Sequence, residues 1–196
     1  SSDVCSSDLH WTPRLRTSSW AQPSNPCSDP ITELAMTQSP LNTFRLDGKT
    51  ALVTGGAGIL GQRFAHGLAS AGAKVAVVDL HEAAAREVAA SIGPDAHGFG
   101  CDVANADSVQ ACVDAVVERF GRIDILHNNA ATKTADPRKF FTAFEDYSLD
   151  VWREVMSVNI DGMFLMAQSV GRQLLRQGQG GAVIQTASIY GLVGPD

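Results

Sequence analysis

The sequence predicts an α/β fold in which a doubly wound parallel sheet is covered by helices on both faces. From Thr50 onward, short apolar segments alternate with helical segments of roughly 10–15 residues, which is typical of successive strand–helix–strand units. The apolar segments are hydrophobic throughout and not only at alternate positions, as expected for strands buried on both sides. A glycine-rich turn joins the first strand to the first helix, which is also typical of this fold class.

Five strands and four helices are expected in alternation. We place the strands at 50–54, 74–78, 97–101, 123–127 and 181–187, and the helices at about 59–71, 82–91, 107–120 and 149–176. The last helix has almost no polar face in its first four turns, whereas a surface helix normally has one apolar stripe. We therefore expect it to pack on the sheet with one side and to be covered on another by a second subunit or by C-terminal residues that this chain lacks.

The composition indicates one globular domain. Of the 196 residues, 44% are hydrophobic, and the charged share of 18% is below the ordinary value of about 25%. The net charge of −6, without a basic stripe, argues against nucleic acid or an anionic membrane as a partner. No apolar run reaches the roughly 18–20 residues of a membrane helix, and the N-terminus lacks the pattern of a secretory signal. We expect a cytoplasmic protein.

The N-terminal stretch is expected to lie outside the fold. Residues 1–35 are rich in Ser, Pro, Thr and Asp and lack the periodicity of a helix or strand. Their opening resembles a translated sequencing adapter, so we interpret them as an artefact upstream of a true start at Met36; a genuine disordered extension is the alternative. The folded domain is therefore expected over 36–196.

The cysteines give no sign of a metal or redox site. Cys101 and Cys112 have neither CxxC nor Cys/His spacing, and the other two cysteines fall within residues 1–35. We expect Cys101 and Cys112 to be buried thiols in a reducing cytosol, and we expect no metal site.

The turn from Thr54 to Gly61 is suited to binding a pyrophosphate. Its glycines let the chain turn tightly and let N–H groups at the helix N-terminus approach an anion. Asp79 ends the next strand, 18 residues after Gly61, where a carboxylate can bind the ribose hydroxyls of a dinucleotide. We therefore predict a Rossmann-type domain that binds a dinucleotide; a simple helix-capping role for Asp79 is the alternative.

Asp79 also predicts which dinucleotide is preferred. A 2′-phosphate about 4 Å from its carboxylate would be repelled by about 4 kcal/mol per charge pair at an effective dielectric constant near 20. No Lys or Arg follows to compensate, because the next residues are Leu80 and His81. We predict NAD as the cofactor and expect NADP to be used less well.

An ordered set of motifs points to a family. Besides the glycine turn and Asp79, the motifs are Cys101-Asp102-Val103, Asn128-Asn129-Ala130-Ala131, Ser157-Val158-Asn159 and Thr186-Ala187-Ser188. Together they resemble the short-chain dehydrogenase/reductase superfamily in its one-domain form, over about residues 44–196. The resemblance implies an oxidoreductase that transfers a hydride between nicotinamide and a small alcohol or ketone, which could be sugar-like. It also implies a homo-oligomer, either a dimer or a tetramer.

The resemblance implies roles for individual residues. Asn159 resembles the helix asparagine that supports a water molecule in a proton relay, and Ser188 resembles the serine that orients the substrate oxygen. The implied cofactor-binding residues are Gly55, Gly58, Ile59, Leu60, Gly61, Asp79, Leu80, Asp102, Val103, Asn129, Ala130 and Ala131.

Two positions depart from the usual family pattern. The turn fits TGxxGxxG, as in the extended, epimerase-like relatives, with Ile59 where glycine is usual. The usual Asn-Asn-Ala-Gly ends here in Ala131, which adds a methyl group where the cofactor passes. We interpret both as variants within working enzymes.

The Tyr-x-x-x-Lys motif of the family does not occur in the chain. Tyr190 stands only two residues after Ser188 and has Gly194 in place of the lysine. We therefore expect a fragment that lacks the C-terminal strands and is inactive by itself, taken from an active oxidoreductase. A non-catalytic dinucleotide-binding protein and an extended sugar-nucleotide epimerase or dehydratase are the alternative functions. The segment 132–147 is expected to be a solvated loop; recognition of a polar or acidic substrate through Lys133, Arg138 and Lys139 is the alternative.

Overall fold

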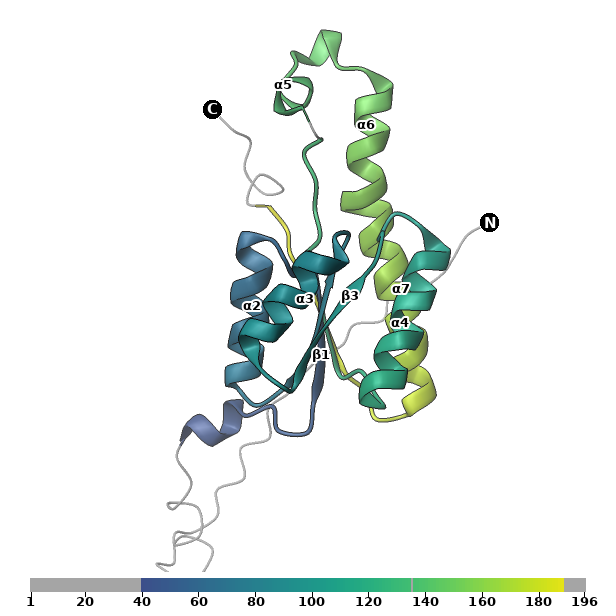
Figure 1. The fold of residues 1–196 in the computed structure, drawn as a ribbon. Helices are drawn as coiled ribbons and strands as arrows, with labels where there is room; N and C mark the ends of the chain where they lie inside the picture. Colours follow the sequence, from purple (N-terminus) through teal and green to yellow (C-terminus); the bar gives the residue numbers. More distant parts are fainter. Residues whose placement is uncertain (1–39, 135, 189–196) are drawn as a thin grey trace, which may run out of the picture. The chain divides into compact units, whose positions relative to one another are not determined.

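A computed structural model describes residues 40–134 and 136–188 (Figure 1). Its centre is a five-stranded parallel sheet with the strand order β3-β2-β1-β4-β5. The strands are β1 (Thr50–Thr54), β2 (Lys74–Asp79), β3 (Ala96–Gly100), β4 (Ile125–Asn128) and β5 (Ala182–Gln185). The predicted doubly wound α/β fold with five parallel strands is confirmed. The order of the strands reverses between β1 and β4.

Helices cover both faces of the sheet, as Figure 1 shows. On one face, α2 (Ile59–Ser70) and α3 (Glu82–Ile92) pack on β1, β2 and β3. On the other, α4 (Ala106–Phe120) and α7 (Met163–Gln177) pack against each other, and α7 contacts β4. One apolar cluster fills each layer. The central strand β1 is fully buried, whereas all four residues of the outermost strand β5 are exposed.

Local sequence explains where α4 begins and ends. The side chain of Asn105 accepts hydrogen bonds from the N–H groups of Asp107 and Ser108, which caps the first turn. Gly121 follows the helix with a φ of 82°, a left-handed conformation that glycine adopts without a steric penalty. Asn105 and Gly121, which flank the helix in the sequence, therefore determine where α4 begins and ends.

The helix predicted over 149–176 changes its winding in the middle. It consists of α6 (Leu149–Met156), a π-helical turn (Ser157–Gly162, η3) and α7. Gly162 lies where the turn touches the loop after β3, because a Cβ there would be 2.8 Å from Cγ2 of Val103. The π turn thus brings this helix close to the carboxyl end of the sheet.

The apolar side of this long helix is uncovered within the described residues. Its large apolar side chains with more than half of their surface exposed are Leu149, Trp152, Ile160, Phe164 and Leu175. The predicted packing of the opposite side is confirmed, because Val155 and Met166 are buried.

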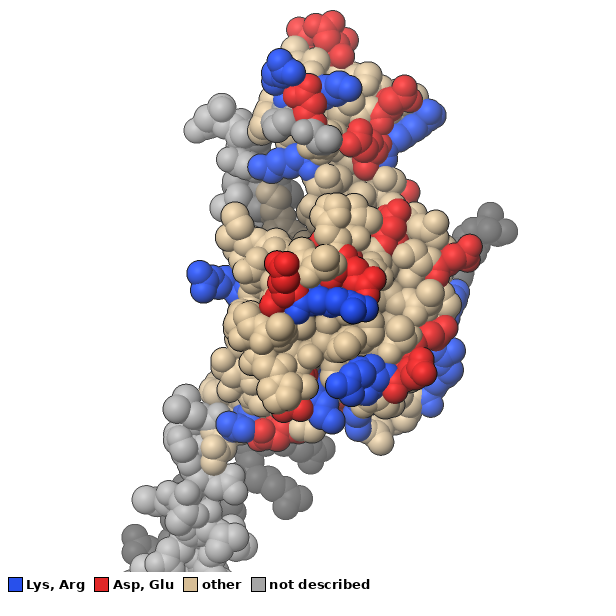
Figure 2. Space-filling view, viewed as in Figure 1, with Lys and Arg blue, Asp and Glu red and all other residues tan. Residues whose placement is uncertain are grey.

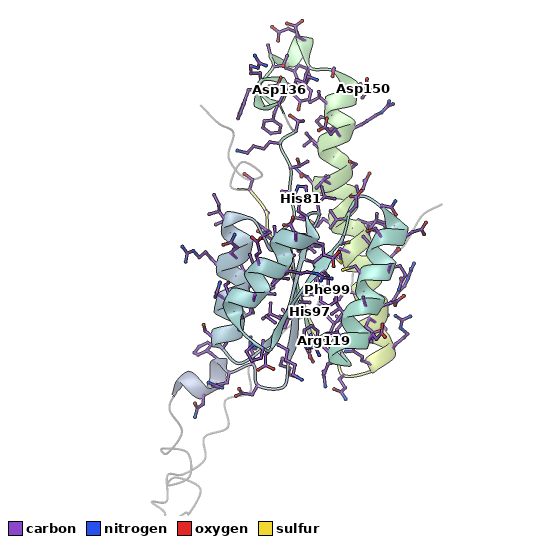
Figure 3. All side chains as sticks on the ribbon, viewed as in Figure 1. His81, His97, Phe99, Arg119, Asp136 and Asp150 are labelled. Atoms are coloured by element: carbon purple, nitrogen blue, oxygen red, sulfur yellow. The ribbon has the colours of Figure 1, made fainter. Side chains whose placement is uncertain are left out.

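Short helices interrupt the segment that the sequence predicts to be a solvated loop. Within 132–147 the chain forms α5 (Pro137–Phe140) and η2 (Phe144–Asp146), and a further 3-10 helix, η1 (Pro40–Phe44), precedes β1. Figure 3 shows Asp136 and Asp150 in the part that projects beyond the end of the sheet. The solvated character is confirmed, since Phe141 and Phe144 are 72% and 94% exposed.

Candidate cofactor-binding site

A cavity of about 260 Å³ opens at the carboxyl ends of the strands. It lies beside β1 and β4, where the strand order reverses, which is the usual position of ligands in open α/β sheets. Its lining residues are Gly55, Val78, Asp79, Leu80, His81, Cys101, Asp102, Val103, Ala130, Ala131, Thr132 and Val158. Figure 3 shows His81 at this end of the sheet and Arg119 toward the opposite end.

The turn between β1 and α2 packs so closely on neighbouring backbone that Gly55 and Gly61 could not carry side chains. Gly55 has a φ of 61°, and a Cβ there would lie 2.9 Å from Cα of Ala130. A Cβ on Gly61 would lie 2.0 Å from the carbonyl oxygen of Gly55. The N-cap residue of α2 is Gly58, so no side chain caps the N–H groups of the first turn. This cradle fits a pyrophosphate at a helix N-terminus.

Asp79 connects the glycine turn to the end of β2. Its Oδ2 accepts a hydrogen bond from the N–H of Ala57 at 3.1 Å, and its Oδ1 accepts one from the N–H of His81 at 3.1 Å. The N-cap residue of α3 is His81, so Asp79 does not cap that helix. Its half-buried carboxylate braces the turn and faces the cavity.

Thr54 joins the two loops on either side of the cavity, a role that the sequence analysis missed. Its buried hydroxyl accepts hydrogen bonds from the N–H groups of Asn129 (2.9 Å) and Ala130 (3.0 Å) and donates one to Oδ1 of Asn128 (3.2 Å). Nδ2 of Asn129 donates in return to the carbonyl of Thr54 at 3.2 Å. The sequence did contain a signal for this role, because the hydroxyl of a threonine at the end of a buried strand needs hydrogen-bond partners.

Asn159 lies in the π turn and holds the segment that follows β4. Its Oδ1 accepts a hydrogen bond from the N–H of Thr132 at 2.7 Å, and its Nδ2 donates one to the carbonyl of the same residue at 3.1 Å. Thr134, two residues on, has a φ of 88°, which is unusual for a β-branched residue. Turns of π helix are frequent at functional sites, and this one fixes a wall of the cavity.

Ser188 lies beyond the end of β5, where it is exposed. Before it, the N–H of Thr186 donates to the carbonyl of Asn128 at 3.0 Å, and the Thr186 hydroxyl lies 3.2 Å from Nε2 of His127. Burial lowers the pKa of His127, which favours a neutral imidazole at neutral pH. The sequence analysis did not single out this pair of the buried His127 and the half-buried Thr186. Tyr190 is outside the described residues.

The structure gathers most of the predicted cofactor residues around one cavity. Those in its lining are Gly55, Asp79, Leu80, Asp102, Val103, Ala130 and Ala131. The glycine turn and the start of α2 hold Gly58, Ile59, Leu60 and Gly61, and Asn129 follows β4. Neither Asn159 nor Ser188 is in the lining.

The cavity wall carries two carboxylates and, among the described residues, neither lysine nor arginine. Asp79 and Asp102 are its acidic residues, and neither Lys nor Arg occurs among the residues that line it. On the face shown in Figure 2, acidic and basic side chains are interspersed. In the part of the chain that the structure describes, no group of three or more His, Cys, Asp or Glu side chains could hold a metal ion. No helix within those residues has the length and apolar character needed to cross a bilayer.

The strand order and the cavity define a Rossmann-type nucleotide-binding fold, and comparison with known proteins identifies the family. Residues 49–196 match the family described as short chain dehydrogenase, so the chain belongs to the short-chain dehydrogenases. D-threitol dehydrogenase of Mycolicibacterium smegmatis is 48% identical over 148 residues, which cover 74% of this chain and 54% of that protein. Sorbitol dehydrogenase of Cereibacter sphaeroides is 39% identical over 148 residues, or 76% of this chain and 56% of that protein.

A solved structure supports the same assignment. The crystal structure of NAD⁺-bound xylitol dehydrogenase is similar with a TM-score of 0.70 at 36% identity, over 76% of this chain and 56% of that one. The chain thus spans little more than half the length of these relatives.

Proposed function

We propose that the protein to which this chain belongs is an NAD-dependent oxidoreductase that transfers a hydride between nicotinamide and a small alcohol or ketone. Family membership supports the reaction type, and the threitol, sorbitol and xylitol dehydrogenases among its relatives support polyols as the substrate class. One observation carries the choice of NAD: Asp79 faces a cavity whose lining contains neither Lys nor Arg.

The residues of this end of the sheet fit the parts of NAD. The uncapped first turn of α2 after Gly58 would bind the pyrophosphate, and the Asp79 carboxylate would accept hydrogen bonds from the adenosine ribose hydroxyls. Asp102 and Val103, across the cavity, would flank the adenine. Asn129, held by Thr54, would contact a ribose from the other side.

The chain's own polar groups would then orient the substrate. Bound NAD supplies a two-electron acceptor at its nicotinamide ring. Ser188 would donate a hydrogen bond to the substrate oxygen, and Asn159 would keep the segment after β4 in place through Thr132. Because no Tyr-x-x-x-Lys occurs in these 196 residues, we assign cofactor binding to this chain and turnover to the longer protein. The exposed apolar side of α6 and α7 supports a homo-oligomer.

The test combines a binding titration of this chain with hydride-transfer assays of the complete reading frame on threitol, sorbitol and xylitol. We expect kcat/KM with NAD to exceed that with NADP by about tenfold or more. NAD lacks the 2′-phosphate that the Asp79 carboxylate would repel, and a tenfold difference corresponds to about 1.4 kcal/mol. Equal use of the two cofactors would contradict the assignment.

Ser188→Ala tests the serine in the same assay. We expect kcat to fall about 100-fold, the effect of removing one hydrogen-bond donor to a reacting oxygen, with NAD affinity unchanged. Ser70→Ala is the control, because among the described residues the exposed Ser70 hydroxyl bonds within α2, to the carbonyl of His66. A kcat for Ser188→Ala within about threefold of the parent would show that this serine has no role in the reaction.

A further inference from the structure

A histidine is buried in the central sheet, on the side that α2 covers. His127 lies in β4 and is 8% exposed, and its ring packs against the ring of Phe64 from α2, with 4.2 Å between the ring centroids. A buried imidazole needs a hydrogen-bond partner. His127 finds it in Thr186, directly after β5, whose hydroxyl oxygen lies 3.2 Å from Nε2 of the ring.

The hydrogen atoms of this contact follow from its neighbours. The Thr186 hydroxyl has one hydrogen, and it donates that hydrogen to Oδ1 of Asn129 in a long hydrogen bond of 3.5 Å. Its oxygen must therefore accept from His127, so the ring carries a proton on Nε2. The backbone of Thr186 is fixed as well, because its N–H donates to the carbonyl of Asn128 at 3.0 Å. The hydrogen bonds from His127 through Thr186 to Asn129 are called the amide relay below.

The amide relay ends beside the glycine turn. Nδ2 of Asn129 donates one hydrogen to the carbonyl of Thr54 at 3.2 Å. It also lies next to Gly55, which lines the cavity, because a Cβ on that glycine would be 3.3 Å from Nδ2. Within the described residues the second hydrogen of Nδ2 forms no hydrogen bond, so it is available to a ligand.

We propose that His127 is a positioning residue for the dinucleotide: through Thr186 it orients the amide of Asn129 so that Nδ2 donates to the cofactor beside the glycine turn. The effect on the cofactor rests on the proposed function, whereas the amide relay itself does not.

The relay selects one of two orientations of the Asn129 amide. If the amide were rotated by half a turn, Oδ1 would face the carbonyl of Thr54, and Nδ2 would face the hydroxyl hydrogen of Thr186. Two acceptors and two donors would then oppose each other, and the amide would present an oxygen to an anionic cofactor. His127 enforces the observed orientation because its Nε2–H leaves the Thr186 hydroxyl no other role than that of donor to Asn129.

NMR of the histidine rings tests the amide relay without any ligand. In a chain with isotope-labelled histidine, the His127 signals are those that disappear in His127→Leu. We expect a proton on Nε2 that exchanges slowly with water, because it is buried and hydrogen-bonded. Thr186→Val removes the hydroxyl at nearly constant volume and should make that exchange faster. A ring protonated on Nδ1 alone, or the same exchange rate in both chains, would overturn the relay.

Titration with NAD separates the donor from the ring. His127→Phe and His127→Leu keep an apolar contact with Phe64 but lack the donor, whereas the side-chain amide of His127→Gln can donate in place of Nε2. We expect the two variants without the donor, and Thr186→Val, to raise the Kd about fivefold, equivalent to about 1 kcal/mol. His127→Gln should stay within about twofold of the parent. A role in packing alone predicts the reverse order, and that order would overturn the proposal.

The control is a histidine outside the relay. His66 lies in α2, and its Nε2 is 3.2 Å from the hydroxyl of Ser91 in α3, away from the cavity lining. His66→Leu should bind NAD like the parent, and a melting curve for each variant shows whether it is folded. The affinities for NAD and NADP should fall by the same factor in the His127 variants without the donor, because Asn129 does not approach the 2′-phosphate side at Asp79 in the proposed binding mode.

Two outcomes separate this inference from the proposed function. A parent chain that binds NAD, with the same Kd in His127→Phe, His127→Leu and Thr186→Val, would overturn the positioning role and leave the proposed function intact. A folded parent chain that binds no NAD would contradict the proposed function and the positioning role together, and the ring spectrum would still decide the amide relay.

Discussion

Two aspartates at opposite ends of the sheet are held in different ways. Asp124 precedes β4 at the amino end and is 5% exposed. Its carboxylate accepts hydrogen bonds from Nε of Arg122 (2.8 Å) and the N–H of Thr50 (2.9 Å), and Nζ of Lys49 lies 3.5 Å away. Asp79, at the carboxyl end, is half-buried and accepts from the N–H groups of Ala57 and His81; within the described residues it forms no ion pair.

The difference separates a charge used for folding from a charge available for binding. The two cations beside Asp124 neutralise it within the protein, and its backbone N–H and carbonyl bond Thr50 and Ala182, so it ties together the amino ends of three strands. The hydrogen bonds to Asp79 come from backbone N–H groups, and within the described residues no cation neutralises its charge. Under the proposed function, the same residue type therefore serves stability at one end of the sheet and ligand specificity at the other.

The largest expected effect is at the carboxyl end, on binding. Gly61→Ala places a Cβ 2.0 Å from the carbonyl oxygen of Gly55, and this backbone contact cannot be relieved without opening the cradle. We expect the affinity for NAD to fall by about 100-fold or more, equivalent to about 2.7 kcal/mol. In the control, Gly67→Ala in the same helix, a Cβ meets nothing within 4 Å. That variant should bind NAD normally and melt slightly higher, since alanine favours helix over glycine by about 1 kcal/mol. Equal affinities of the two variants in a titration would contradict the cradle.

The next effect is at the amino end, on stability. Asp124→Asn leaves Arg122 and Lys49 without their carboxylate, and we expect the free energy of unfolding to fall by about 2–4 kcal/mol. Asp79→Asn loses one hydrogen bond from a backbone N–H, and we expect a loss of about 1 kcal/mol or less. Chemical denaturation of both variants measures the difference. Equal losses would remove the distinction between the two ends.

Low pH should reduce the loss of stability caused by Asp124→Asn. Burial raises the pKa of Asp124, but the hydrogen bonds from Arg122 and Thr50 outweigh it, so the folded pKa is lowered. The stabilisation by this carboxylate is thus present above the unfolded pKa of about 3.9 and is lost as the pH falls through the lower folded pKa. We expect the gap in unfolding free energy between the parent and Asp124→Asn to be constant from pH 7 to pH 5, and to shrink to about 1 kcal/mol or less near pH 2. A gap that stays constant down to that pH would show that the charge of Asp124 is not what stabilises the fold.

The regular part of the fold could be predicted because each strand is apolar throughout and each helix is bounded by identifiable residues. β1 has the predicted bounds, and α4 begins one residue early, at Ala106, because Asn105 is its cap. Two features escaped prediction. The π turn keeps the apolar pattern of an α-helix, and the short helices of 137–146 are too brief to show a period.

The candidate site was predictable where backbone geometry demands a particular residue. Gly55 and Gly61 are such positions, since a side chain at either would meet backbone atoms. The partners of the residues that hold the site together were not predictable, because the contacts join residues distant in sequence: Thr54 with Asn129, and Asn159 with Thr132. Pairing of this kind follows from the strand order, which a single sequence does not specify.

The most direct test of the account is the affinity of the parent chain and of Asp79→Asn for NAD and NADP, measured by titration calorimetry. We predict that the parent binds NAD more tightly than NADP by about tenfold or more, because a 2′-phosphate would approach a carboxylate that forms no ion pair within the described residues. Asp79→Asn should bind NAD more weakly and NADP more tightly, so that the two affinities differ by less than about threefold. A parent chain that binds both equally, or a variant that keeps the full preference, would contradict the assignment of Asp79 as the residue that selects NAD.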